Sequence, residues 1–182
     1  MIPPRVALFS LTCFALSTAA GQSPAQVTVC ELLQDPSGWN GKFVQISADI
    51  DFDGLPERGP SLFGRKCSTS ILVKGLSFPN LIGIADPQSV VQRVHVVEFE
   101  WDEGARGQFQ SLLQTVNPKT EHIRATVVGL FETRTPFGDL VRINAVHPGG
   151  LRVGFGPGGA LPAQVLVKTM TGMRIERNQN SR

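Results

Sequence analysis

The sequence predicts a mainly β protein, built as a small closed or partly open barrel with a short N-terminal helix and one amphipathic helix between strands. Several segments alternate apolar and polar residues, which is the pattern of half-buried strands. The chain also contains 19 Gly and 13 Pro, which favour turns over long helices. Its 182 residues, of which 41% are apolar, are enough for one domain with a buried core.

Residues 1–20 have the order of a signal peptide, with an early positive charge at Arg5, an apolar run and a small-residue end at Ala20. Cleavage after Ala20 gives an exported protein, secreted or periplasmic, with no stable membrane span. The alternative is a retained N-terminal anchor. We expect residues 21–27 to be a short linker and residues 28–173 to be the barrel domain.

Two cysteines remain after this leader, Cys30 and Cys67. An exported protein meets an oxidising environment and two thiols allow one intramolecular pairing, so we expect a disulfide between them. The alternative is two independent buried thiols. The sequence disfavours a metal site at either cysteine, because no second Cys or His lies beside it at ligand spacing.

The domain is expected to begin with a helix and a strand. Thr28 and Glu31 have the spacing of a capping box that opens a short helix, and Pro36 is expected to end it. The segment 43–52, FVQISADIDF, then alternates between apolar and polar residues from Val44 onward. This alternation predicts a half-buried strand.

The polar face of this strand resembles the opening of a calcium-binding loop. Asp49, Asp51 and Asp53 occupy positions one, three and five of such a loop, and Gly54 occupies position six. Position twelve, which needs a bidentate Glu, is Pro60. The sequence therefore indicates no metal, and the carboxylates are interpreted as the solvent face of the strand. A calcium site at the three aspartates is the alternative.

The segment 95–102, HVVEFEWD, predicts a second acidic strand that buries Val97, Phe99 and Trp101. If the two acidic strand faces were neighbours, their carboxylates would repel one another or share a cation. We expect instead that basic side chains on adjacent strands neutralise them. The candidates are Lys42, Arg65, Arg124 and Arg142.

The remainder of the chain supplies one helix and further strands. Residues 102–117 carry apolar side chains at helical spacing, which predicts an amphipathic helix. Its apolar stripe consists of Phe109, Leu112, Leu113 and Val116. We expect strands at 122–135 and 163–175, a hairpin arm at 135–146, a loop or irregular strand at 147–162 and a polar mobile tail at 174–182.

The stretch VTVCELLQDPSGWNGKFVQISADI resembles the entry of OB-fold-like domains in uncharacterised bacterial proteins that carry signal peptides. Those domains share a V-x-x-C-E-L segment, a D/N-P-x-x-aromatic-N-G-K turn and a V-x-V/I strand. The stretches CSTSILV, VVGLFET and GFGPGGALPAQVLV resemble later segments, so the resemblance covers most of residues 27–170. The chain departs from its relatives at Trp39, near Ala48 and at Pro157, where they carry Tyr, Gly and His. The resemblance implies an OB-like barrel and no particular activity.

Composition and motifs restrict the function. A net charge of +2 gives no basic face for nucleic acid, which we therefore do not expect as a partner. His95, His122 and His147 are scattered, and no nucleophile elbow, P-loop or cofactor motif occurs. The expected function is a non-catalytic binding module of the cell envelope for a protein, peptide or saccharide. The alternatives are a cation-stabilised structural domain and an unrecognised hydrolase that uses Asp51 and Glu100.

Ligand-binding residues are expected in the two Gly-rich segments 54–64 and 147–159, because loops carry function more often than cores do. The candidates are Arg58, Phe63, Arg152 and Phe155. The two phenylalanines have a second interpretation, as side chains that plug the barrel.

Overall fold

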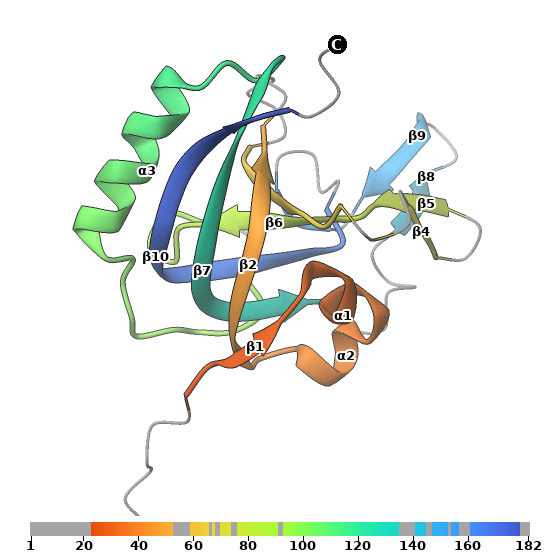
Figure 1. The fold of residues 1–182 in the computed structure, drawn as a ribbon. Helices are drawn as coiled ribbons and strands as arrows, with labels where there is room; N and C mark the ends of the chain where they lie inside the picture. The colour runs from red at the N-terminus through yellow and green to blue at the C-terminus, as the bar shows by residue number, and fades with distance from the viewer. Residues whose placement is uncertain are drawn as a thin grey trace, which may run out of the picture.

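Five strands close into a barrel in the computed structural model (Figure 1), which describes residues 23–52, 59–65, 67, 70–73, 76–90, 93–134, 141–144, 147–152, 154–156 and 161–178. Around the barrel the strands are β2 (Phe43–Asp51), β3 (Ser61–Phe63), β6 (Leu81–Ala85), β10 (Ala163–Arg177) and β7 (Glu121–Thr133). The last of these pairs back with the first, so the barrel is closed. Strands β6 and β10 are parallel, and the other barrel pairs are antiparallel. This five-stranded arrangement is OB-like and confirms the predicted fold class.

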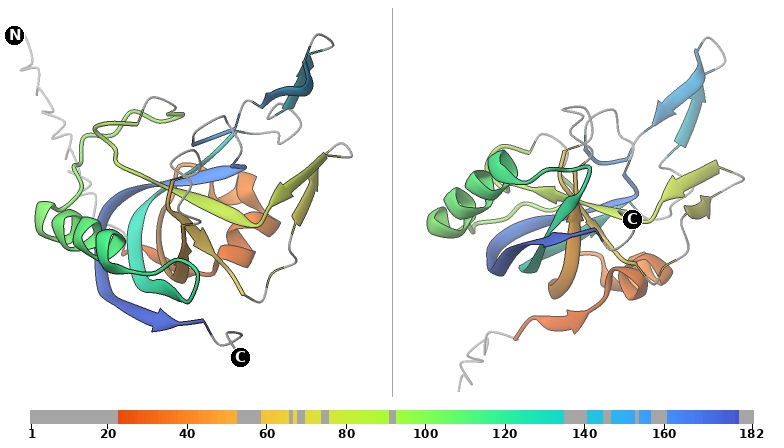
Figure 2. Two further views of the ribbon diagram at one scale, coloured as in Figure 1. Left: turned by 90° about the horizontal axis from the view of Figure 1, so that it is seen from above. Right: turned by 45° about the horizontal axis from the view of Figure 1, so that its top comes forward.

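The remaining elements lie outside the barrel wall (Figures 1 and 2). The helices are α1 (Val29–Gln34), α2 (Pro36–Trp39) and α3 (Glu103–Thr115). Strand β1 (Ala25–Val27) pairs in parallel with β2. Two hairpins project from the side opposite α3. They consist of β4 (Ser70–Val73) with β5 (Leu76–Pro79), and β8 (Val141–Asn144) with β9 (His147–Arg152).

The barrel interior is formed by the apolar positions of alternating strands. Val44, Ile46 and Ile50 of β2 are fully buried and pack with branched residues of β7 and β10, such as Ile123 and Val165. The alternation predicted for 43–52 is therefore confirmed. Branched side chains suit this position because they pack well on a pleated surface.

The two longest strands approach closely at Gly129 of β7. A Cβ atom there would lie 2.2 Å from the carbonyl oxygen of Leu166 on β10. Strand β10 also bends at a register shift between Thr171 and Arg174, and Gly172 supplies a φ of 61° within it. Such a bulge increases local bending and lets one long strand follow a closed wall.

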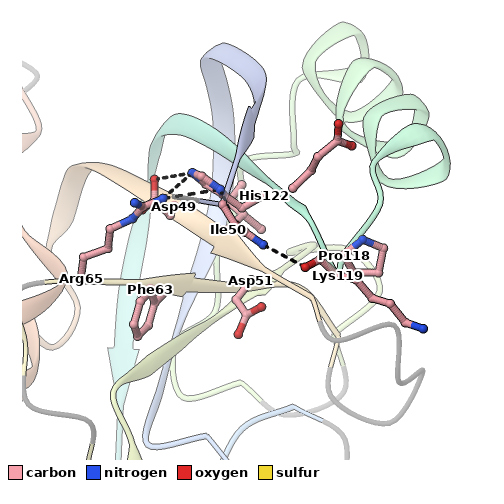
Figure 3. A pocket seen from close by; sticks show the side chains of 10 residues that line it. Asp49, Ile50, Asp51, Phe63, Arg65, Pro118, Lys119 and His122 are labelled. Atoms are coloured by element: carbon pink, nitrogen blue, oxygen red, sulfur yellow. Dashed lines mark hydrogen bonds and ion pairs between the residues drawn. The ribbon is translucent and has the colours of Figure 1, made fainter. Parts of the chain in front are cut away.

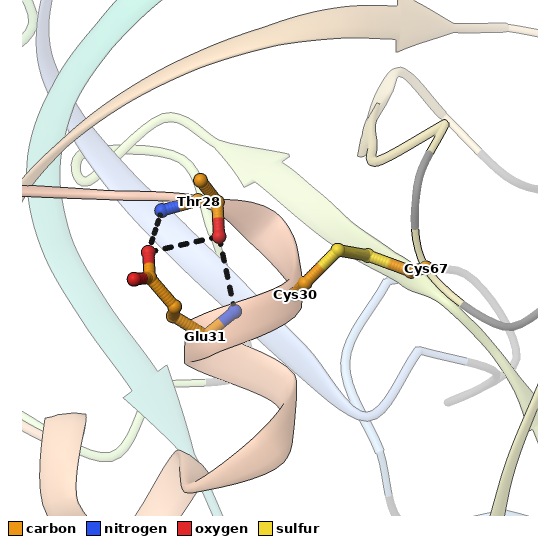
Figure 4. The surroundings of a disulfide bond; sticks show 4 residues. All are labelled: Thr28, Cys30, Glu31 and Cys67. Carbon is orange, nitrogen blue, oxygen red and sulfur yellow. Dashed lines mark hydrogen bonds between the residues drawn. A yellow bond between two sulfur atoms is a disulfide. The ribbon is translucent and has the colours of Figure 1, made fainter.

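Both short N-terminal helices have side-chain caps, and Figure 4 shows that of α1. The Thr28 hydroxyl accepts from the Glu31 backbone N–H, and the Glu31 carboxylate accepts from the Thr28 backbone N–H, so the predicted capping box is confirmed. The first helix ends at Gln34, directly before Asp35 and Pro36, as predicted, but a second short helix, α2, follows that was not predicted. Asp35 accepts from the Gly38 N–H and caps a second helical turn, in which proline is tolerated at the first position.

Helix α3 matches the predicted amphipathic helix. Asp102 caps it by accepting from the Ala105 backbone N–H at 2.8 Å, and Phe109 is buried on the barrel side. The helix packs against β10. Trp101 stacks near Phe109, with ring centroids 5.8 Å apart.

The predicted strand at 95–102 is wrong. Residues 96–102 are extended, and their side chains alternate between partly buried and exposed, but they pair with no strand among the described residues. Phe99 packs on Phe43, with ring centroids 5.1 Å apart. The alternation therefore reflects packing of an extended segment on the outside of the barrel, not membership of a sheet.

Two boundaries also differ from the prediction. The expected linker at 21–27 contains β1, and the expected tail at 174–182 begins with four residues that continue β10 alongside β7. After this strand, the Asn178 backbone N–H donates to the Thr120 carbonyl at 2.7 Å. The polar character of this segment reflects its place on the outer face of the barrel.

The predicted Cys30–Cys67 disulfide is present, with Cα atoms 5.4 Å apart (Figure 4). It joins α1 to a turn in which the Cys67 backbone N–H donates to the Gly64 carbonyl at 3.0 Å. A Cβ atom at Gly64 would lie 2.7 Å from the Cys67 sulfur, so this approach requires glycine. The bridge therefore holds the turn that also contains Arg65.

Candidate functional site

A pocket of about 680 Å³ lies on the outside of the barrel, where β2 ends and β7 begins (Figure 3). Its size is within the range of small-molecule sites. We call it the polar pocket. It is lined by Asp49, Ile50, Asp51, Phe63, Arg65, Pro118, Lys119, Glu121, His122 and Asn178.

Strand register brings the polar side chains together. Asp49 of β2 is paired with Arg124 of β7, and Glu176 of β10 is paired with His122 of β7. Their neighbours Ile50 and Ile123 point into the barrel core, so these four side chains lie on its outer face. Three strands that are distant in sequence thus contribute to one row of polar groups.

Asp49 is the acidic centre of this row. Its carboxylate forms ion pairs with the Arg65 Nε atom and, at 3.3 Å, with the Arg124 Nη1 atom. The residue is only 6% exposed, so its predicted solvent-facing position is wrong. Neutralisation by Arg65 and Arg124 is confirmed for this carboxylate. Asp51 is exposed at the strand end and lines the pocket, while Asp53 lies outside the described residues.

His122 is buried beside this carboxylate and contacts both Arg65 and Asn178. The Arg65 Nη2 atom lies 2.7 Å from the His122 Nε2 atom and 3.5 Å from Nδ1, so the guanidinium lies against the ring. The Nδ1 atom lies 2.9 Å from the Asn178 side-chain oxygen, which accepts its hydrogen. The Asn178 amide nitrogen faces the Lys119 carbonyl at 3.5 Å, which is consistent with this orientation.

Glu176 completes the row on the far side of the histidine. Its Oε2 atom lies 3.6 Å from His122 Nε2, and its Oε1 atom accepts from Arg174 Nε at 2.7 Å. Asp49, His122 and Glu176 each offer one ligand atom, and these atoms lie within 4.8 Å of one another. This group differs from the predicted calcium alternative, which used three aspartates of one strand.

The predicted ligand-binding residues have different locations. Phe63 lies in β3 and lines the polar pocket. Arg152 is the last residue of β9, for which the structure describes the backbone and not the side chains. Arg58 lies outside the described residues.

Phe155 was predicted to be exposed in a Gly-rich loop, and this is wrong, because its exposure is 0%. It forms a bridge with Leu161, and the Arg134 guanidinium lies 5.6 Å from its ring centroid. Its burial agrees with the second interpretation, a side chain that plugs the barrel, although Phe155 is not part of the main core cluster within the barrel.

Sequence analysis missed Glu176 and Asn178, which lie in the segment expected to be a tail, and it treated His122 as a scattered histidine. The alternation of HIRAT, with Ile123 and Ala125 inward, places His122 and Arg124 on the outer face. It does not tell which strand lies beside them, because register is set by long-range pairing.

Comparison of the chain with protein-family models, curated proteins and solved structures found no match. Within the described residues, no helix has the length and apolar character needed to span a bilayer. The disulfide fits a protein that folds in an oxidising compartment.

Proposed function

We propose that the protein is an exported, non-catalytic OB-like binding module of the cell envelope, and that its polar pocket holds a saccharide. The observation that carries this proposal is the placement of the Phe63 ring in a pocket whose other walls carry carboxylates, a guanidinium and an ammonium group. A sugar presents apolar C–H faces and hydroxyl edges. An aromatic wall beside several charged hydrogen-bonding groups matches both parts.

Export is supported by two features of the chain. The signal-peptide order of residues 1–20 and the Cys30–Cys67 disulfide both fit a protein that leaves the cytoplasm. The resemblance of residues 27–50 to OB-fold-like domains with signal peptides supports the same location.

A binding role, as opposed to catalysis, is supported by the state of the pocket's acidic groups. Asp49 is engaged in ion pairs with two arginines, so it is not a free carboxylate in the pocket. None of the described residues that line the pocket is Ser, Thr or Cys. Glu100, which the hydrolase alternative paired with Asp51, does not line the pocket.

The experiment measures binding of the mature chain to immobilised envelope glycans, with unrelated peptides as a second ligand set. Phe63→Ala is expected to weaken glycan binding about tenfold, because one aromatic contact is worth about 1 kcal/mol. Phe43→Ala is the matched control, since Phe43 is 37% exposed and does not line the pocket.

Two outcomes contradict the proposal. Equal binding by Phe63→Ala and wild type places the ligand elsewhere, and binding to peptides alone refutes the saccharide. Glycan hydrolysis that disappears in Asp51→Asn shows instead that the protein is an enzyme.

A further inference from the structure

We propose that Asp49, His122 and Glu176 form a binding site for a divalent transition-metal ion such as Zn²⁺, and that the Arg65 guanidinium is the cation that this metal displaces. The site lies beside the polar pocket and uses three strands of the barrel; Figure 3 shows two of its residues, Asp49 and His122, together with Arg65. This inference does not depend on the saccharide proposed above.

Two of the three distances between the ligand atoms suit a small metal ion, and the third, between the two carboxylates, is within 4.8 Å. His122 Nε2 lies 3.4 Å from Asp49 Oδ1 and 3.6 Å from Glu176 Oε2. Zinc bonds to nitrogen and carboxylate oxygen of about 2.0–2.2 Å, arranged tetrahedrally, place ligand atoms about 3.3–3.6 Å apart. One histidine nitrogen and two carboxylate oxygens are also ligand types that zinc accepts.

The histidine is oriented as a metal ligand would be. Its Nδ1–H donates to Asn178, and its Nε2 atom lies toward the two carboxylates. A metal-binding histidine almost always donates its other N–H to such a partner, which selects the tautomer and fixes the ring. Asn178 is therefore a positioning residue for this site.

Three electron-pair donors converge here, and they repel one another unless a cation lies among them. Arg65 supplies that cation, because its Nη2 atom contacts His122 Nε2 and its Nε atom pairs with Asp49. Arg174 holds the other oxygen of Glu176, Oε1, whereas Arg124 Nη1 lies 3.3 Å from Asp49 Oδ1, the oxygen that would bind the metal, and Arg65 Nε pairs with Asp49 Oδ2. A metal can replace Arg65 without leaving either carboxylate unsupported.

Arg65 is also the partner that can leave most easily. Its side chain is 42% exposed, so the guanidinium becomes hydrated when it moves out. It lies on a turn outside the strands, whereas Asp49, His122 and Glu176 lie within paired strands. The ligands are thus held by the barrel and the competing cation by a surface turn.

The test is a titration of the chelator-treated mature chain with Zn²⁺, read by competition with a metallochromic indicator, and with Co²⁺, whose absorption spectrum reports tetrahedral coordination. Wild type is expected to bind one ion. His122→Gln is expected to lose about 100-fold or more in affinity, since the removal of even an outer-sphere partner costs about 10–100-fold.

Arg65→Gln is expected to bind zinc at least about tenfold more tightly than wild type, because the competing cation is gone. His95→Gln is the matched control, since His95 lies 3.3 Å from a different carboxylate, that of Glu132. It is expected to bind zinc as wild type does.

A purely structural ion-pair cluster gives the opposite result for Arg65→Gln, namely lower stability and no gain in zinc affinity, and this overturns the proposal. Equal zinc affinity of His122→Gln and wild type also overturns it. If His122→Gln does not fold, the Arg65→Gln comparison still decides, because that variant changes a half-exposed surface residue.

Discussion

Two histidine–carboxylate pairs occur near opposite ends of β7, and their surroundings differ. Glu132 is 0% exposed and accepts from the backbone N–H groups of Val94 and His95 at 3.1 and 2.6 Å, and from the Gln164 side chain at 2.7 Å. Asp49 is paired mainly with Arg65 and Arg124, each 42% exposed. The first carboxylate is bound by neutral groups of the folded chain, and the second by flexible cations that reach solvent.

This difference gives the two carboxylates different roles: Glu132 is structural, whereas Asp49 has partners that can be exchanged. Two of the donors to Glu132 are backbone N–H groups and the third is the buried amide of Gln164. They are fixed by the fold and do not move into solvent as a long cationic side chain can. Glu132 therefore attaches the extended segment at 94–95 to the wall. The partners of Asp49 can hydrate, so an incoming ligand can replace them at low cost.

The comparison predicts a large loss of stability for Glu132→Ala. The substitution removes the buried acceptor of two backbone N–H groups and of the buried Gln164 amide. We expect the free energy of unfolding to fall by about 3–5 kcal/mol, because three donors lose a charged acceptor at a cost of about 1–2 kcal/mol each. Urea unfolding followed by tryptophan fluorescence measures it.

Glu132→Gln is the control for this variant. The substituted glutamine keeps an acceptor oxygen for the Val94 and His95 N–H groups, but its amide nitrogen faces the amide nitrogen of Gln164. We therefore expect an intermediate loss of stability. A loss below about 1 kcal/mol in Glu132→Ala contradicts the structural role of this carboxylate.

The second prediction concerns the disulfide, because it holds the turn that carries Arg65, one of the two exchangeable partners of Asp49. Cys67 closes the turn that contains Arg65. The bridge spans a sequence separation of 37, for which the loss of chain entropy in the unfolded state predicts about 3–4 kcal/mol of stabilisation.

The measurement compares unfolding of wild type and Cys30→Ser/Cys67→Ser under non-reducing conditions, with wild type under reductant as the reference. The double variant should be insensitive to reductant. If wild type unfolds at the same urea concentration with and without reductant, the bridge adds no stability and the prediction is wrong.

A smaller effect is expected for Asp49→Ala. Loss of its carboxylate leaves Arg65 and Arg124 unpaired, but both reach water, so we expect a cost of about 1–2 kcal/mol. The same unfolding measurement applies, and Asp49→Asn, which keeps an acceptor, should cost less. A loss as large as that of Glu132→Ala would show that the two pairs are equivalent and that the comparison fails.

The barrel was predictable from local pattern, whereas the site was not. Alternation identified Val44, Ile46 and Ile50 as core residues, because one side of a strand must be buried. The same pattern put Asp49 in solvent, since it tells which face a residue lies on and not what covers that face. His122 and Glu176 meet through the register of β7 with β10, a long-range pairing that no local spacing encodes.

The predictions for Phe155 and for segment 95–102 were wrong for related reasons. Flanking glycines suggested that Phe155 is exposed, although glycine beside a large side chain also permits close packing. The alternation of 95–102 is real, but a segment that packs on the barrel through Phe99 satisfies it without strand pairing. The capping box of Thr28 and Glu31 was predictable because all its groups lie within four residues.

Glu31 provides the smallest effect and extends the comparison to a fully solvated carboxylate. The hydrogen bond from the Thr28 backbone N–H, and then that from the Thr28 hydroxyl, hold the pKa of Glu31 below its ordinary value. A carboxylate with a lowered folded-state pKa stabilises the fold above its unfolded pKa, about 4.3, and this contribution disappears as pH falls through the folded value. We therefore expect Glu31→Gln to unfold at lower urea than wild type at pH 7.

The gap between Glu31→Gln and wild type should narrow progressively below about pH 4.3, because the protonated glutamate and the glutamine are then both neutral. Urea midpoints measured from pH 7 to pH 3 test this. Thr28→Ala should retain most of the pH dependence, since its backbone N–H still donates to the carboxylate and gives the larger effect. A gap that stays constant over this range would mean that the charge of Glu31 contributes nothing to the cap, and that its role is limited to a neutral hydrogen bond.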